Sequence, residues 1–473
     1  MAELHELSAL EQAAAVRSRT VSPVELVEHH LDRIARLDGL LHAFVTTTPE
    51  LALEQAKEAE QAVVSTPAAE LPPLHGVPTA IKDLSVTKDA PTAFGSRALV
   101  GFQSPLDAHV VTGLRRAGLI SLGKTATPEF GLTAHSRTEF GEEPRTPWDL
   151  GHSAGGSSGG AGAAVAAGLV PIAQGSDAGG SIRIPASVCG LVGLKPSFGR
   201  ESGGPTPPDP AQLAVRGVLT RTVRDSAAGL DALVAYRSGG LVPLPRPDGT
   251  YLAQADRDPG RLRIGRFTVA PNGVDVDPEC VRAVDVATEL LTGAGHEVEE
   301  IKPPAGPEFA DLFTKVWALK AAGAPVPAGK ESLLRPVTRM LRELGAGIGG
   351  AEAMTILAAL QGAARLVIDR TADYDVVLCP TLSMPPRPAG WFTDGDDPAA
   401  EFERTMQFVA FTPLQNATGQ PAVSLPVHWT ADGLPIGAML AGRPGDEATL
   451  ISLSAQLEAA SGWVPRRADL PTA

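Results

Sequence analysis

The residues best suited to chemistry lie in two clusters of glycine and serine between residues 151 and 190. The first is GGSSGG at 155–160 and the second is DAGGS at 177–181. Glycine lets a backbone approach a ligand closely, so two such turns can aim hydroxyl and N–H groups at one point. Acyl transfer needs such a nucleophile and an oxyanion hole. The composition alone leaves open a plain glycine-rich turn with a buried capping serine.

The second cluster offers a serine at the end of an expected strand. An apolar run at 170–174 precedes the turn, and Ser181 closes it. A small-residue turn can expose this hydroxyl, and successive backbone N–H groups can form an anion-binding nest. The N–H groups in question belong to Ala178, Gly179, Gly180 and Ser181.

A nucleophilic serine needs a base. No histidine lies within 155–190, and His152, His296 and His428 have no recognisable catalytic setting. The other route is a lysine kept neutral by burial. Lys82 ends the apolar run HGVPTAIK and is such a candidate. A surface lysine paired with the neighbouring Asp83 is the alternative.

A third serine matches a different catalytic motif. Residues 151–155 (GHSAG) fit the GxSxG turn of α/β-hydrolases, which needs a buried strand directly before it. The preceding residues, EEPRTPWDL, are polar and contain two prolines. An esterase that uses Ser153, with His296 or His428 as its base, is therefore a weakly supported alternative.

Short apolar segments alternate with helical patterns along most of the chain. The sequences S-x-x-E at 8–11 and 22–25 are capping boxes that begin two N-terminal helices, and 50–64 predicts a third. Alternating strands and helices indicate an α/β fold with helices on both faces of a sheet. The expected strands are 77–81, 119–122, 170–173, 262–269 and 376–378; the expected helices include 107–117, 158–168, 222–235, 278–294 and 447–460.

The composition excludes several classes of protein. The 473 residues carry a net charge of −14, which argues against nucleic-acid binding. The N-terminus has no signal-peptide pattern, and no run reaches the roughly 18 apolar residues of a membrane span. We therefore expect a cytoplasmic protein without membrane contact. The cysteines 189, 280 and 379 lie far apart and predict buried free thiols rather than a zinc site or disulfides.

Several motifs occur together and in a fixed order. They are HGVPTAIKD at 75–83, GKTATPEF at 123–130, RTPW at 145–148, GGSSGG at 155–160, SDAGGSIRIPASVCGLVGLKP at 176–196, RTVRD at 221–225, NATGQP at 416–421 and DGLPIG at 432–437. Together they resemble the amidase signature family across roughly 5–460. The resemblance implies a single amidase signature domain over 1–473, with a twisted mixed sheet covered by helices on both faces. Its parts would be N-terminal helices at 5–65, a catalytic core at about 70–235 and 370–465, and a helical pocket or lid region at about 300–370.

The resemblance also implies a Ser–cis-Ser–Lys triad that acts through an acyl-enzyme. Ser181 would be the nucleophile, Ser157 the bridging serine after a cis peptide bond, and Lys82 the neutral base. The N–H groups of 178–181 would bind the oxyanion, and no metal or organic cofactor is implied. Supporting roles fall to Ser158, Asp177 and Arg183, and pocket walls to Phe130, Gly131 and the helices of 303–345.

The expected substrate is a small molecule with an apolar or aryl amide, or a carbamate. The members that this chain resembles include hydrolases of nylon oligomers, aryl acylamidases and urethanases. Ala126, Ala178 and the segments 133–144 and 200–215 depart from the common glutaminase-type members. The glutaminase subunit of a tRNA-dependent amidotransferase is therefore an alternative function rather than the expected one. We expect a monomer or homodimer.

Overall fold

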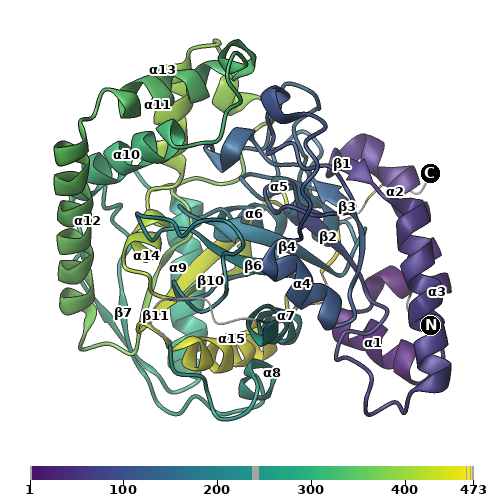
Figure 1. Ribbon diagram of the computed structural model, residues 1–473. Helices are drawn as coiled ribbons and strands as arrows, with labels where there is room; N and C mark the ends of the chain where they lie inside the picture. The colour runs from purple at the N-terminus through teal and green to yellow at the C-terminus, as the bar shows by residue number, and fades with distance from the viewer. Residues whose placement is uncertain (1–2, 237–243, 465, 469, 471–473) are drawn as a thin grey trace.

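One eleven-stranded mixed sheet runs through the protein (Figure 1). The computed structural model describes residues 3–236, 244–464, 466–468 and 470. The strands, in their order across the sheet, are β1 (Phe44–Thr47), β3 (Ile120–Thr125), β2 (Pro78–Lys82), β4 (Ile172–Asp177), β6 (Val215–Thr220), β5 (Val192–Lys195), β10 (Ala422–Trp429), β11 (Pro435–Gly442), β9 (Val376–Pro380), β7 (Arg263–Arg266) and β8 (Glu297–Glu300).

Strands β2 and β4 place the two halves of the candidate site side by side. They are parallel neighbours, with Ile81 opposite Gln174. The carboxyl ends of parallel neighbours lie at the same edge of a sheet. The end of β2 at Lys82 and the end of β4 at Asp177 therefore meet there, although about ninety residues separate them in the chain.

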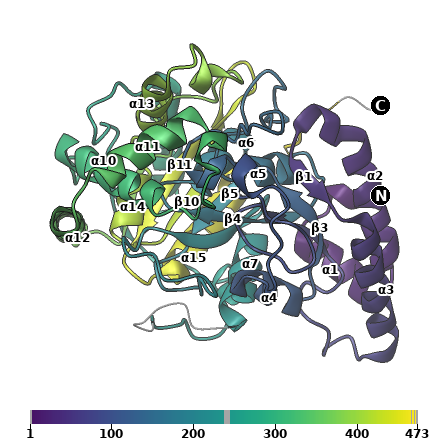
Figure 2. The ribbon, with the colours of Figure 1, turned by 45° about the horizontal axis from the view of Figure 1, so that its top comes forward.

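Helices cover both faces of the sheet, which confirms the predicted fold class (Figures 1 and 2). Successive strand residues point to opposite faces. In β4, Ile172 packs into a cluster with α4 and α7, whereas Ala173 packs into a cluster with α2 and α5. The helices are α1 (Ala9–Arg17), α2 (Pro23–Leu41), α3 (Pro49–Ser65), α4 (His109–Arg116), α5 (Gly159–Ala166), α6 (Arg183–Cys189), α7 (Val223–Tyr236), α8 (Tyr251–Gln254), α9 (Pro278–Gly293), α10 (Pro307–Ala322), α11 (Pro336–Ala346), α12 (Gly350–Thr371), α13 (Pro398–Phe408), α14 (Pro413–Ala417) and α15 (Glu447–Ser461).

The first two helices begin as predicted. Ser8 and Ser22 both form capping boxes, with Glu11 and Glu25 as the reciprocal partners. All five predicted strands overlap observed ones, but the edges shift by a few residues and six further strands were not expected. β10 is the clearest of these. It contains Pro426, and its pairing with β11 shifts register there.

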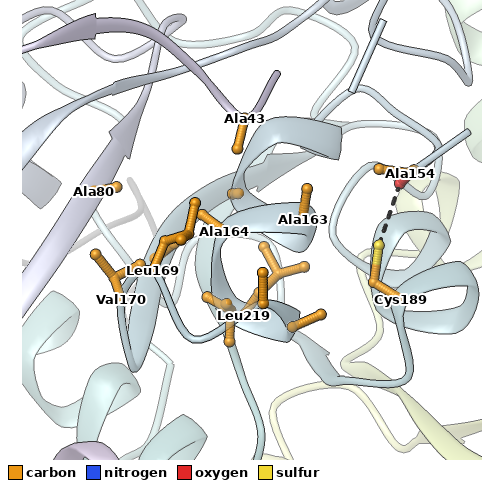
Figure 3. Packing of buried hydrophobic residues seen from close by; sticks show 14 of the residues in the cluster. Ala43, Ala80, Ala154, Ala163, Ala164, Leu169, Val170, Cys189 and Leu219 are labelled. Carbon is orange, nitrogen blue, oxygen red and sulfur yellow. Dashed lines mark hydrogen bonds between the residues drawn. The ribbon is translucent and has the colours of Figure 1, made fainter. Parts of the chain in front are cut away.

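Helix α5 lies inside the core, and every residue of it is buried. Its small side chains let the helix approach its neighbours closely, as Figure 3 shows for Ala163 and Ala164 beside Leu169 and Leu219. Close to it, Cys189 Sγ donates to the carbonyl oxygen of Ala154 at 3.7 Å. The three cysteines are buried free thiols, as predicted. Burial raises the pKa of Cys189 to about 12, so this thiol is unreactive at neutral pH.

Helices α10, α11 and α13 lie at the upper left of the molecule in Figure 1, and α12 runs down its left edge. Among the described helices, α12 alone is long and apolar enough to cross a membrane, by length and composition only. It has 22 residues and a mean hydropathy of 1.4, and 22% of its most apolar 18-residue window is buried. The helix is nevertheless two-sided, because Ile356, Leu360, Ala364 and Val367 form a buried stripe that packs toward α10.

Candidate active site

Lys82 lies at the end of β2 with no exposed surface. Its Nζ donates to Ser157 Oγ at 2.7 Å and to Ser176 Oγ at 3.0 Å. Burial lowers the pKa of Lys82 well below its usual value; the carboxylate of Asp177 partly opposes this, while Arg216 adds to it. A neutral amine in contact with a hydroxyl can serve as a base.

Asp83 does not neutralise Lys82, so the surface ion pair that the sequence left open is not formed. The Asp83 carboxylate faces Lys124 instead, with Oδ1 and Nζ 3.3 Å apart. Lys124 also donates to Thr92 Oγ1 at 2.7 Å. Among the residues that the structure describes, Lys82 forms no ion pair. Its amine is therefore surrounded by hydroxyl groups.

Ser157 precedes α5 and follows a cis peptide bond from Gly156, as the family resemblance implied. Gly131 lies directly beside it. A Cβ at Gly131 would lie 3.1 Å from Ser157 Oγ and 2.8 Å from Leu84 Cδ1, and the residue has a φ of +72°. Only glycine fits this close approach without displacing the bridging serine.

Ser158 and Ser176 attach the start of α5 to β4. Ser158 Oγ donates to the carbonyl oxygen of Ser176 at 3.3 Å, and Ser176 N donates back to Ser158 Oγ at 3.4 Å. Ser176 is a contact of Lys82 that sequence reasoning missed. Its signal was its place as the next-to-last residue of the strand that ends beside β2.

Ser181 lies in the turn after β4 and is 7% exposed. It lines a small pocket, of about 30 Å³, which Gly131 also lines. Gly131 thus contacts the space around both serines. Within the described part of the chain no hydrogen bond joins Ser181 to Ser157, so that step of the predicted relay stays a prediction. Catalytic hydrogen bonds often tighten only when substrate is bound.

A buried ion pair shapes the turn that carries Ser181. Arg183 donates through Nε and Nη2 to the two carboxylate oxygens of Asp177, both at 2.9 Å. Asn416 Nδ2 donates to Asp177 Oδ1 at 2.9 Å and also to its carbonyl oxygen. Burial alone would raise the pKa of Asp177, but Arg183, Lys195 and Asn416 together hold it well below its usual value. The carboxylate is therefore a fixed anion, not a proton donor.

The same carboxylate corrects one predicted oxyanion donor. Gly180 N donates to Asp177 Oδ1 at 2.8 Å, which removes this N–H from the predicted set. In the described structure the N–H groups of Ala178, Gly179 and Ser181 make no such bond. Gly180 instead matters for its backbone: its φ is +126°, and a Cβ there would lie 2.2 Å from Thr412 Oγ1.

The pocket at Ser181 is walled mainly by apolar side chains. Helix α10 supplies two aromatic residues to this wall, Phe313 and Trp317. Both lie within 303–345, the segment whose helices were expected to line the pocket. Phe130 packs against the core cluster that contains Phe313 and Trp317, and its expected role as a pocket wall stays a prediction. Helix α13 supplies a wall that the sequence reading missed, because over 200 residues separate it from Ser181. The lining includes Gly131, Phe313, Trp317, Phe402, Thr405 and Met406.

The GxSxG alternative has neither of its structural requirements. Ser153 follows an irregular segment rather than a strand, and its Oγ donates to Glu143 Oε1 at 2.5 Å. His296 contacts Leu262 N and Gln456, and His428 contacts Glu279. Neither histidine contacts Ser153, which therefore has no base among them.

Comparison with known proteins gives one consistent result. A family model described as Amidase matches residues 25–451. The 6-aminohexanoate-cyclic-dimer hydrolase of Paenarthrobacter ureafaciens is 35% identical over 97% of this chain and 96% of the relative. A solved 6-aminohexanoate cyclic dimer hydrolase with substrate has a TM-score of 0.90 at 32% identity, covering 98% of this chain and 99% of that one. A bacterial aryl acylamidase has a TM-score of 0.85 at 27% identity, covering 99% of both chains.

Proposed function

Because this chain belongs to the amidase signature family, whose members hydrolyse amide C–N bonds, we propose that it cleaves small neutral amides through a Ser181–Ser157–Lys82 relay. The observation that carries the proposal is the 2.7 Å contact between Ser157 and a fully buried lysine that forms no ion pair with any described residue. A charged lysine in that position would lack a carboxylate partner, which burial strongly disfavours.

The relay works as two linked proton transfers. Ser181 Oγ attacks the carbonyl carbon while its proton passes to Ser157 Oγ, and the Ser157 proton passes to Lys82 Nζ. The carbonyl oxygen takes the electron pair and accepts hydrogen bonds from free N–H groups of the turn at 178–181. Ser157 then returns a proton to the leaving amine, and water cleaves the acyl-enzyme by the same route.

The pocket supports a neutral, largely apolar substrate. No charged side chain lines it among the described residues, and its aromatic walls suit alkyl or aryl groups. Amides with such groups, including anilides, fit these walls, and a carbamate has the same carbonyl and a similar size. The cyclic dimer named for the relatives is an uncharged amide of this general kind.

The test compares Ser181→Ala with Ser153→Ala on a panel of aryl amides, aliphatic amides, esters and carbamates. We expect Ser181→Ala to lower kcat/KM by at least about 10³-fold and Ser153→Ala to retain turnover. A fluorophosphonate should label Ser181 by mass spectrometry, and EDTA should not change the rate. Loss of turnover only in Ser153→Ala would contradict the assignment. Glutamine as the best substrate, together with copurifying partner subunits, would favour the amidotransferase alternative.

A further inference from the structure

We propose that Thr405 of α13 determines substrate specificity, its hydroxyl binding a second, uncharged polar group on an otherwise apolar substrate. The inference rests on the proposed function, since the pocket concerned is the one at Ser181. Thr405 lies in the wall of that pocket together with Ser181 and is 5% exposed. It would contact the substrate away from the bond that is cleaved.

The Thr405 hydroxyl has no hydrogen-bond partner among the residues that the structure describes. Sixteen buried side-chain nitrogen or oxygen atoms lack a hydrogen bond among the described residues. Among the residues that carry these atoms, Thr405 is the one that lines the Ser181 pocket. Buried polar atoms are usually hydrogen-bonded, so an exception in a substrate pocket points to a ligand.

Two helical threonines of this protein show the usual local arrangement of the hydroxyl. A threonine within a helix normally donates to the carbonyl oxygen three or four residues earlier. Thr288 of α9 donates to Val284 O at 2.8 Å, and Thr371 of α12 donates to Val367 O at 2.9 Å. Thr405 makes neither bond in the described structure, so its hydroxyl has no local acceptor.

The orientation of α13 is fixed by contacts made outside the pocket. Glu401 accepts from Arg335 Nη2 at 3.2 Å and contacts His135 Nε2 at 3.0 Å. These contacts are buried, and they tie the helix to α11 and to the segment before Ser157. The residues of α13 and its end that face the pocket follow i, i+3, i+4 and i+7 spacing, namely Phe402, Thr405, Met406 and Val409.

The other residues that line the pocket restrict which chemical group of a substrate Thr405 could bind. Thr133 is the other threonine of the pocket, and its hydroxyl already donates to His135 O at 3.1 Å. Apart from the nucleophile, Thr405 is therefore the hydroxyl left to recognise a polar group. It can donate or accept, which suits a carbonyl or a second amide. A charged group would find no counter-ion in this wall.

The experiment uses neutral 4-nitroanilides of heptanoate and of its 4-, 5- and 6-oxo analogues, which carry the oxo group on the acyl side of the amide. A second series of amides carries the oxo group on the amine side. The variants are Thr405→Val, which removes the hydroxyl, and Thr405→Ser, which retains it. Thr338→Val is the matched control, because Thr338 Oγ1 is equally buried and unpartnered but does not line the pocket. Both valine variants should keep or raise Tm, since each removes an unpaired buried hydroxyl.

We expect the wild type to prefer at least one oxo analogue over its methylene counterpart, chiefly through KM. Thr405→Val should lose about tenfold of that preference, measured as the ratio of kcat/KM for the oxo analogue to kcat/KM for the plain heptanoyl compound. Thr405→Ser and Thr338→Val should keep the preference. An identical preference in Thr405→Val and the wild type across both series would overturn the role of Thr405 while amide hydrolysis stands. A wild type that hydrolyses none of the anilides would overturn the proposed function and this inference with it.

Discussion

Lys82 carries the strongest prediction at the scale of single residues. Its pKa is lowered by burial, and the relay needs its neutral form. As pH rises through that pKa, the amine loses its proton, so kcat/KM should rise and then level off. Lys82→Met should lower kcat/KM by about 10³-fold or more and remove the rising limb. Rates measured from pH 5 to 10 on one anilide check this.

A second buried lysine could imitate that pH dependence and provides the control. Burial and the nearby Arg183 lower the pKa of Lys195 to about 7, and its Nζ donates to Pro196 O. If Lys82 produces the rise of kcat/KM with pH, Lys195→Met should still show that rise. A limb that disappears in Lys195→Met, or a rate that falls with rising pH in the wild type, would argue against a neutral Lys82.

Sequence reasoning reached the contact between Lys82 and Ser157 but not the hydrogen bonds around it. The contact joins a motif that ends β2 to one that precedes α5, and the family resemblance implied that the two meet. That the N–H of Gly180 binds Asp177 depends on how one turn folds over its own carboxylate, and residue types alone do not determine this. The segment at 130–131 shows the same limit: Gly131 lines the pocket, whereas Phe130 packs against the core cluster that contains Phe313 and Trp317.

At the scale of elements, the ion pair between α11 and α13 supports the pocket wall. Arg335 and Glu401 are each about 95% buried, and burial alone would raise the pKa of Glu401. His135 and Arg335 outweigh that effect and lower it below the usual value. Arg335→Met should destabilise the protein by about 3 kcal/mol, because it leaves a buried carboxylate short of a cation. It should also raise KM, which urea unfolding and kinetics check together.

The lowered pKa of Glu401 also determines how acidification changes the stability of the protein. The depressed pKa of Glu401 contributes stability that is present above about pH 4.5, its unfolded value, and that is lost as pH falls through the folded pKa. The wild type should therefore lose more stability than Arg335→Met on acidification. The double variant Arg335→Met/Glu401→Gln should recover most of the lost stability at neutral pH. An Arg335→Met protein as stable as the wild type would show that the pair does not hold α13.

Elements with regular patterns were predictable, and those shaped by distant contacts were not. The capping boxes of α1 and α2 are local and appear in the structure as expected. Strand β10 contains Pro426, a residue that argues against a central strand, and a register shift in its pairing accommodates it. Helix α13 has an amphipathic pattern, but nothing local indicates that it reaches Ser181.

At the scale of the whole molecule, an acidic protein encloses three lysines with almost no exposed surface. The chain carries a net charge of −14, yet Lys82, Lys124 and Lys195 are each at most 1% exposed. Burial lowers the pKa of all three. Between its folded and unfolded pKa values, such a lysine is protonated only in the unfolded chain. The unfolding free energy therefore rises with pH over that window.

Lys195 gives this linkage a measurable form, because its window runs from about pH 7 to the ordinary lysine value of 10.5. One proton bound only by the unfolded chain corresponds to a slope of about 1.4 kcal/mol per pH unit.

Replacing Lys195 by methionine removes that contribution, whereas all other groups cancel in the comparison. The stability of Lys195→Met relative to the wild type should thus be greatest at or below pH 7 and should decline by about that slope toward pH 10. Urea unfolding at half-unit pH steps measures the difference. A difference that does not vary with pH would mean that Lys195 stays protonated in the folded protein, with Asp177 and Glu447 as counter-charges, and that burial alone does not decide the charge of lysines in this core.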